Sequence, residues 1–216
     1  MDAKQTILFD LDGTLLDTRE LILSSYRYAT RKVLGKRLPD ELILPYIGIP
    51  LIYQMRKLAP EHAEELMLVY REHNARVHDE LIRYFEGTRE TLEELQSEGR
   101  QLAVVTSKRN EPAMKGLECF GLEGYFQLIV GSEDTTKHKP DPAPLLFATK
   151  QLDVPLASCV YVGDSPYDMQ AARAAGITAI GALWGMFSHE DLTQGGAQYE
   201  IPRITALPAA LHDIEG

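Results

Sequence analysis

Five short apolar segments constrain the fold of this chain more than any other feature of its sequence. The first begins at Ile7, and the others lie at 101–107, 126–132, 158–164 and 177–183. Each is apolar on consecutive positions, without the alternation of a strand that has one face in water. This pattern is typical of parallel strands that are buried on both faces of a sheet.

Helical segments alternate with these expected strands. The segment "GTRETLEELQSEG" has Thr88 as its expected N-cap and closes at Gly99, and "SPYDMQAARAAG" has Pro166 near its start and Gly176 just past its end. Strands that alternate with helices predict an α/β domain with a doubly wound, mostly parallel sheet. In such sheets, binding and catalysis concentrate where the carboxyl ends of the strands open into loops.

Residues 18–85 interrupt this alternation, because they contain helical patterns and no convincing strand. One helix is expected to end at Gly35, and a longer one covers 60–84. The longer helix has an apolar face, made by Ala63, Leu66, Tyr70, Val77 and Leu81. The sequence therefore predicts an α/β catalytic core at 1–17 and 86–216, with an α-helical cap subdomain at 18–85 inserted into it.

Composition narrows the possible partners and the compartment. The formal net charge of −10 argues against nucleic acid or an anionic membrane as the main partner, so an anionic substrate requires a local cation. No apolar run approaches a membrane span of about 18 residues, and charges come too early for a signal peptide. Cys119 and Cys159 form no CxxC pair, which favours free thiols in a reducing compartment. We expect a cytoplasmic protein, monomeric or homodimeric.

Carboxylates stand at the carboxyl ends of two expected strands. Asp10 and Asp12 follow the first strand, two positions apart, and Asp164 follows the fourth. Carboxylates this close repel each other unless a cation lies between them. Mg²⁺ prefers oxygen ligands, and Asp10 and Asp164 can each give it one carboxylate oxygen. The pattern predicts a Mg²⁺ site at this edge of the sheet.

The same edge carries groups suited to phosphoryl transfer. Asp10 can attack phosphorus and form an aspartyl-phosphate, while Asp12 can protonate the leaving oxygen and later deprotonate the incoming water. Thr106 and Ser107, at the end of the second strand, and Lys139, in the loop after the third, can hold the oxygens of the transferring group.

Four motifs within residues 7–168 closely resemble those of the haloacid dehalogenase superfamily, and they occur in the family order. They are "FDLDGTLLD", "VVTS", "KHKPDP" and "VGDSPYD". The resemblance implies that Asp10 is the nucleophile and that Asp12 is the general acid/base, with its backbone carbonyl on Mg²⁺. It further implies that Asp164 ligates Mg²⁺ and that Asp168 ligates the ion or orients a water bound to it.

The helical insertion resembles the cap of the phosphoglycolate phosphatase-like branch of that superfamily. The segment "LPYIGIPL" is similar to the substrate-specificity loop of such caps, and Gly48 within it would allow close approach of a ligand. Arg56 is a second cap residue that we expect near the substrate. "GALWGMFSHEDL" is similar to the corresponding segment of phosphoglycolate phosphatases and related pyrophosphatases.

The expected activity is Mg²⁺-dependent hydrolysis of a small phosphorylated metabolite, as in phosphoglycolate phosphatases. The alternatives are an inorganic pyrophosphatase of the same branch and a sugar-phosphate mutase similar to β-phosphoglucomutase. Mutases of that kind carry a His near the start of the cap with a Trp a few residues on, and "TRELILSSYRYA" has neither. Three other functions are disfavoured. Dehalogenation needs neither a metal nor an acid at the position of Asp12, and phosphonate cleavage needs a cap lysine that forms an imine with the substrate, which nothing in the sequence places over the site. A phosphorylatable receiver domain would have no cap.

Overall fold

The computed structural model describes residues 5–215 and contains a six-stranded sheet in which every neighbouring pair is parallel. Its strands are β1 (Thr6–Phe9), β4 (Gln101–Val105), β5 (Leu128–Val130), β6 (Cys159–Gly163), β7 (Thr178–Ala182) and β8 (Tyr199–Ile201). The order β5-β4-β1-β6-β7-β8 shows that the chain winds outward on one side of β1 and then on the other. The predicted doubly wound fold is confirmed, and its switch point lies beside β1.

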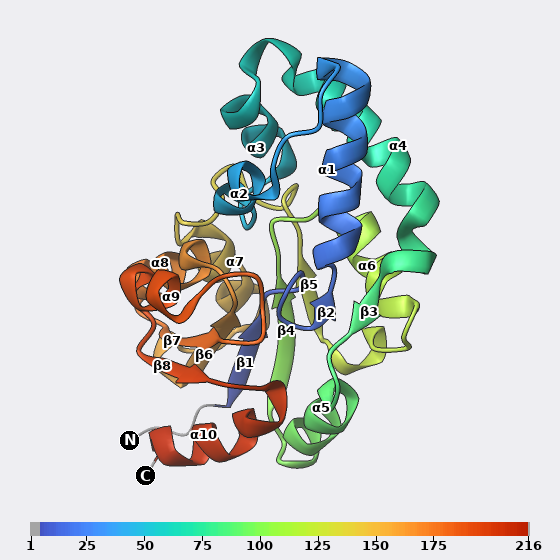
Figure 1. Cartoon of the computed structure of the whole chain (residues 1–216). Coiled ribbons are helices and arrows are strands. Elements are labelled where there is room, and N and C mark those ends of the chain that lie inside the picture. The colour runs from blue at the N-terminus through green and yellow to red at the C-terminus, as the bar shows by residue number, and fades with distance from the viewer. Residues whose placement is uncertain (1–4, 216) are drawn as a thin grey trace.

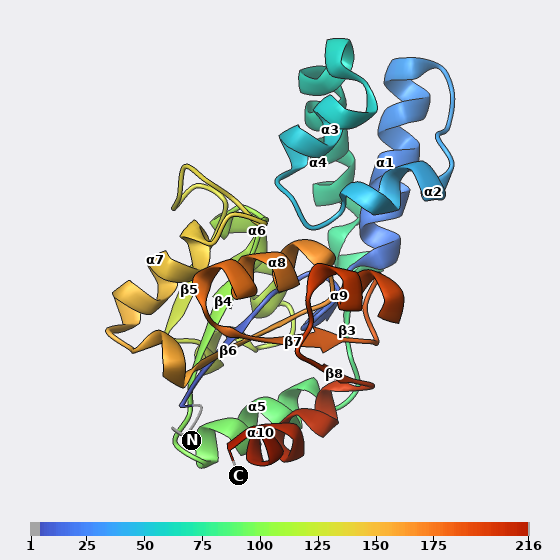
Figure 2. The same cartoon turned by 90° about the vertical axis from the view of Figure 1, so that its left-hand side faces the viewer.

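Helices cover both faces of this sheet, as Figures 1 and 2 show. The helices of one face are α5 (Thr88–Ser97), α6 (Asn110–Glu118) and α10 (Leu207–Glu215), and those of the other are α7 (Ala143–Leu152), α8 (Pro166–Ala175) and α9 (His189–Gly195). Ile7 and Phe9 pack into the first layer, and Leu8 packs into the second. Burial on both faces explains why the strands are apolar on consecutive positions.

The cap is a helical bundle that stands over the carboxyl edge of the sheet (Figure 1). It consists of α1 (Arg19–Leu34), α2 (Asp40–Ile43), α3 (Leu51–Leu58) and α4 (Ala63–Leu81). Tyr26, Met55 and Leu66 belong to a buried apolar cluster that is separate from the two clusters of the sheet. The cap therefore has a hydrophobic core of its own.

Two very short strands connect the cap to the core. β2 (Leu16–Asp17) and β3 (Arg83–Tyr84) pair antiparallel, so the two segments that connect the parts lie side by side. The prediction that residues 18–85 contain no strand is therefore wrong at β3. A strand of two exposed residues has no periodicity by which the sequence could reveal it.

Local signals located most helix ends correctly. α8 begins after Ser165, which forms a capping box with Asp168, and it ends before Gly176 in the left-handed conformation. The expected N-cap at Thr88 is wrong by one residue, because Gly87 takes that position with a φ of +81°. The long cap helix begins at Ala63, since Pro60–His62 forms a 3₁₀ turn before it.

Two further findings bear on the expectations from composition. Cys119 and Cys159 are both free thiols in the structure. Among residues 5–215, no helix combines the length and the apolarity needed to cross a bilayer.

Candidate active site

A cavity of about 500 Å³ lies between the cap and the carboxyl edge of the sheet. The predicted site residues that line it are Asp10, Asp12, Gly48, Thr106, Ser107 and Asp164. They come from the ends of β1, β4 and β6 and from the cap segment between α2 and α3. The parallel sheet thus brings together groups that are up to 154 positions apart in the chain, between Asp10 and Asp164.

Asp10 lies at the buried end of this cavity, with only 4% of its surface exposed. Its Oδ1 accepts a hydrogen bond from Lys139 Nζ at 2.8 Å, whereas no described residue donates to Oδ2. Burial raises the pKa of Asp10 to about 7, and the charges of Asp168 and Asp12 add to this effect while Lys139 opposes it. One carboxylate oxygen is therefore fixed, and the other is free to react or to bind a cation.

Lys139 is a buried cation whose ammonium group is held on several sides. Its Nζ contacts Asp168 Oδ1 at 2.5 Å, the Tyr161 hydroxyl at 2.9 Å and, more weakly, the Val105 carbonyl at 3.5 Å, in addition to Asp10. Burial lowers the pKa of Lys139, but its two carboxylate partners outweigh burial and raise it overall. The side chain thus remains an ammonium beside the nucleophile position.

Asp168 is fully buried, and donors surround both of its oxygens. Oδ2 accepts from the Ser165 amide at 3.0 Å and from the Ser165 hydroxyl at 2.6 Å. Oδ1 accepts from Lys139 and lies 3.1 Å from the Tyr161 hydroxyl. A carboxylate with this many donors has little capacity left for a metal ion. The geometry therefore suits a role of Asp168 in positioning Lys139, and it suits a role as direct metal ligand less well.

Asp164 is also buried, and it is held at the end of β6 by a weaker set of contacts. Its Oδ2 accepts from the Met186 amide at 2.7 Å, and its Oδ1 lies 3.4 Å from the Thr14 hydroxyl. Burial raises the pKa of Asp164 well above its usual range, and the charges of Asp10 and Asp168 raise it further. A Cβ atom at Gly13 or Gly185 would clash with this side chain, so the close approach depends on both glycines.

These buried carboxylates suit a divalent cation. One oxygen from each of Asp10, Asp164 and Asp168 lies within 4.8 Å of the others, and all three residues are buried. Their three negative charges face one buried ammonium, so the ionised cluster has an uncompensated charge that is costly in a dry interior. The donor set consists only of oxygen, which is the preference of Mg²⁺. The residues therefore fit the predicted metal.

The remaining predicted groups lie around the mouth of the site. Asp12 is partly exposed, and its Oδ1 pairs with Lys108 Nζ at 2.6 Å. The buried Thr106 hydroxyl accepts from the Lys108 amide at 3.2 Å. Ser107 donates its hydroxyl to the Gly48 carbonyl of the cap at 2.6 Å, while its main-chain N–H has no hydrogen-bond partner among the described residues.

The two predicted cap residues lie in different surroundings. Gly48 has a φ of +111°, and a Cβ atom there would lie 2.9 Å from the Ser165 hydroxyl, so the cap loop approaches the core closely at this residue. Arg56 is exposed and pairs with Glu64 at 3.2 Å, and it does not line the cavity. The expectation for Arg56 needs correction, because its position on α3 directs the side chain toward α4.

Sequence reasoning missed Lys108 and Tyr161. Lys108 directly follows Thr106 and Ser107 at the end of a strand, so the same topological argument could have included it. Tyr161 lies inside β6, and its hydroxyl donates to the Val105 carbonyl at 2.7 Å. A tyrosine within an apolar strand has no sequence signal that distinguishes this polar contact from ordinary packing.

The fold and site define a doubly wound α/β protein in which an inserted helical cap covers the carboxyl edge of the sheet. A family model of haloacid dehalogenase-like hydrolases matches residues 7–182, and the chain belongs to this family of enzymes. Pyrophosphatase PpaX of Listeria welshimeri is 34% identical over 211 residues, which are 97% of each chain. Pyrophosphatase PpaX of Halalkalibacterium halodurans is 40% identical over 172 residues, 80% of each chain.

Solved structures of phosphatases have the same architecture. A predicted phosphatase of Clostridium acetobutylicum superposes with a TM-score of 0.89 at 28% identity, over 98% of this chain and 100% of the other. A predicted phosphoglycolate phosphatase of Haemophilus somnus gives a TM-score of 0.84 at 25% identity, over 95% and 97%. The chain is thus an enzyme of the haloacid dehalogenase-like hydrolase family, and the proteins compared above have the names of phosphatases and pyrophosphatases.

Proposed function

We propose that the protein is a Mg²⁺-dependent phosphatase of a small anionic substrate and that it acts through an aspartyl-phosphate on Asp10. The observation that carries this proposal is that the buried Asp10 and Asp164 line the capped cavity, with the buried ammonium of Lys139 2.8 Å from Asp10 Oδ1. A fixed, half-free carboxylate beside a buried ammonium suits attack on phosphorus, since the ammonium stabilises the charge of the transferring group.

In the proposed reaction, residues of the chain form and break each bond to phosphorus and transfer each proton. Asp10 Oδ2 attacks phosphorus, and the bond from phosphorus to the leaving oxygen breaks as Asp12 donates a proton to that oxygen. Water then attacks the aspartyl-phosphate, Asp12 takes a proton from it, and the bond to Asp10 breaks. We assign the binding of the phosphoryl oxygens to the Thr106 hydroxyl and the main-chain N–H of Ser107, which both line the cavity.

The metal ion belongs with Asp10 and Asp164. Bound Mg²⁺ would neutralise part of the negative charge of the nucleophile and of the phosphoryl group. Asp12 would contribute its backbone carbonyl, as the family resemblance implies. Asp168 is left to hold Lys139, because its oxygens are already occupied by donors.

Among the possible substrates, inorganic pyrophosphate is our first candidate. The relatives at 34% and 40% identity are named pyrophosphatases and are covered over most of their length. Phosphoglycolate is the second candidate, because a structural neighbour at 25% identity has the name of a phosphoglycolate phosphatase. Both compounds carry a second anionic group close to the transferred phosphoryl group.

A phosphate-release assay with Mg²⁺ tests the proposal. The panel contains pyrophosphate, phosphoglycolate and phenyl phosphate, and the Asp10→Asn variant provides the blank. We expect release from pyrophosphate with the highest kcat/KM and none from the blank. If the wild-type protein and the blank release phosphate equally slowly from every compound, the proposed function is wrong.

A further inference from the structure

A second group of polar side chains lines the cavity, away from the buried aspartates. On the cap, Arg71, Asn74 and His78 lie three to four positions apart on α4 and so share one face of that helix. On the core, Lys108 and Arg109 line the opposite wall, directly before the start of α6. None of these five residues has a role in the transfer steps described above.

Arg71 and Arg109 bring like charges to the same cavity from the two parts of the molecule. Arg71 forms no ion pair with any residue in the described range 5–215. Burial lowers its pKa, and the charge of Arg109 lowers it further against the opposing effect of Glu133. An anion between two guanidinium groups would remove their repulsion and could be bound by both in a bidentate manner.

The carboxylates on the same wall do not neutralise this pair strongly. Glu111 contacts Arg109 at 3.0 Å, but the two side chains are 84% and 46% exposed. Such exposed pairs contribute little and exchange readily with a ligand. Glu133 lines the same cavity, but its effect on the pKa of Arg71 is smaller than the opposing effects of burial and of Arg109.

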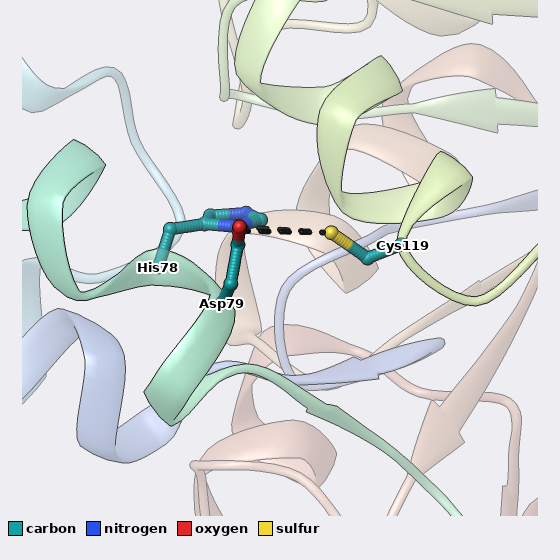
Figure 3. Close-up of side chains that lie close together, drawn as sticks. All are labelled: His78, Asp79 and Cys119. Carbon is teal, nitrogen blue, oxygen red and sulfur yellow. Dashed lines mark hydrogen bonds and ion pairs between the residues drawn. The ribbon is translucent and has the colours of Figure 1, made fainter.

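His78 lines the same wall of the cavity and has one ring nitrogen without a partner in the described part of the chain. Its side chain is 3% exposed, and Nδ1 lies 2.7 Å from Asp79 Oδ1. Figure 3 shows His78 and Asp79 on α4, facing Cys119. The other nitrogen, Nε2, is buried and has no hydrogen-bond partner among the described residues. A nearby anion would raise the affinity of this nitrogen for a proton and make it a donor.

The position of Lys108 relates this wall to the chemistry. Its Nζ contacts Asp12, the residue proposed to protonate the leaving oxygen, and Arg109 is its chain neighbour. A group bound by Arg109 would therefore lie on the side of the leaving group. The transferred phosphoryl group would occupy the other side, near Lys139 and Thr106.

We propose that Arg71 and Arg109 form a subsite for an anionic leaving group, and that the enzyme selects substrates of the diphosphate type. Inorganic pyrophosphate is the smallest such compound. This inference rests on the proposed function, which it deepens by naming the substrate class. Because Arg71 comes from the cap and Arg109 from the core, an anionic leaving group bound by both would also hold the cap against the core.

Kinetics with matched arginine variants test the subsite. The variants are Arg71→Ala, Arg109→Ala, Arg71→Lys and, as control, Arg76→Ala. Arg76 lies on the same helix, but it packs over the Tyr28 ring at 5.2 Å and does not line the cavity. We expect Arg71→Ala and Arg109→Ala to raise KM for pyrophosphate about tenfold or more, in line with the loss of a charge-assisted hydrogen bond.

The comparison with phenyl phosphate gives the specific readout. The kcat/KM ratio of pyrophosphate to phenyl phosphate should fall about tenfold in Arg71→Ala and Arg109→Ala, recover partly in Arg71→Lys and stay unchanged in Arg76→Ala. If both alanine variants alter the two substrates equally, or leave KM for pyrophosphate unchanged, the subsite is wrong.

Binding measurements separate this inference from the proposed function. Calorimetry with Mg²⁺ compares methylenediphosphonate, which cannot be hydrolysed at its bridge, with inorganic phosphate on the Asp10→Asn protein with and without Arg71→Ala. We expect Arg71→Ala to weaken methylenediphosphonate about tenfold and phosphate far less. Equal weakening of both overturns the subsite. A wild-type protein that releases no phosphate, yet shows this difference in binding, overturns only the proposed function.

Discussion

Two clusters in this molecule each place three possible metal ligands within 4.8 Å of one another. One consists of Asp10, Asp164 and Asp168 at the carboxyl edge of the sheet, and the other consists of His78, Asp79 and Cys119, where α4 meets α6. In the first cluster all three residues are buried, whereas in the second only His78 is buried. Both clusters meet the same distance limit, so proximity alone does not distinguish them.

The two clusters differ in net charge and in whether their ligand atoms are available to a metal ion. In the His78 cluster, Asp79 already pairs with Lys115 at 3.0 Å, so a cation is present. Burial raises the pKa of Cys119 and the charge of Asp79 raises it further, which keeps the sulfur as a thiol and a poor ligand. The aspartate cluster has more buried negative charge than Lys139 can neutralise. Uncompensated buried charge, rather than short distances, marks the site that needs a metal.

The largest expected difference between the clusters is in turnover. Asp10→Asn removes the proposed nucleophile and should lower phosphate release at least about a thousandfold, because no other group replaces it. Cys119→Ser, in the other cluster, should leave turnover within about twofold of wild type, as expected for a change outside the site. Phosphate release from pyrophosphate with Mg²⁺ measures both, and circular dichroism checks the fold. Residual activity in Asp10→Asn far above this level would contradict the assignment.

The second largest difference between the clusters is expected in the metal dependence of turnover. Treatment with EDTA should abolish turnover, and Mg²⁺ should restore it while Ca²⁺ restores it poorly, because Ca²⁺ prefers looser coordination with more ligands. Asp164→Asn should raise the Mg²⁺ concentration needed for half-maximal activity about tenfold or more, in line with the loss of one ligand. Cys119→Ser is the control and should not change that concentration. If Cys119→Ser, and not Asp164→Asn, raised the Mg²⁺ concentration needed for activity, the metal site would lie in the His78 cluster instead.

The third difference concerns stability. Asp168→Asn removes a fully buried charge that holds Lys139, and loss of one partner of a buried ion pair should cost about 3 kcal/mol of unfolding free energy. Asp79→Asn breaks an ion pair with an exposed side chain and should change stability only slightly. Urea unfolding of both variants measures this. Equal destabilisation would show that the contacts of Asp168 do not have the importance assigned to them.

A smaller effect is expected in the pH dependence of the metal-free protein. The pKa of Asp10 is raised from 3.8 to about 7, so the folded state holds a proton that the unfolded state has lost. The contribution of Asp10 to stability is therefore complete below about pH 4 and is lost as the pH rises through about 7. Unfolding in urea between pH 4 and 8 should show this loss in wild type and a flatter profile in Asp10→Asn. Added Mg²⁺ should stabilise the protein more at pH 8 than at pH 5.

His78 should act in the opposite direction, with the smallest effect. Burial lowers its pKa below 6.5, although the hydrogen bond to Asp79 opposes this shift. The unfolded state then binds more protons, so the stability that His78 contributes near neutral pH is lost as the pH falls below about 6.5. A comparison of wild type with His78→Gln in the same urea series isolates the contribution of His78 to the pH dependence of stability. If stability at pH 5.5 relative to pH 7.5 is the same in both proteins, the buried neutral state assigned to His78 is wrong.

The sequence by itself determined the sheet and the floor of the site. Consecutive apolar positions can be buried only between two layers of helices, which fixed the parallel sheet. Polar residues that end parallel strands must meet at one edge, which brought Asp10, Thr106 and Asp164 to one cavity. These inferences succeeded because periodicity and strand direction are local properties of a chain that decide a global arrangement.

Only the tertiary structure decided which groups contact one another. Asp168 turned out to be enclosed by Ser165, Lys139 and Tyr161, and Arg56 faced away from the cavity. The approach of Arg71 to Arg109 depends on how the cap sits on the core, which is set by packing and by the β2–β3 connection. Apart from the capping box of Ser165 and Asp168, no local pattern encodes such contacts, because they join residues that meet only when separate elements pack together.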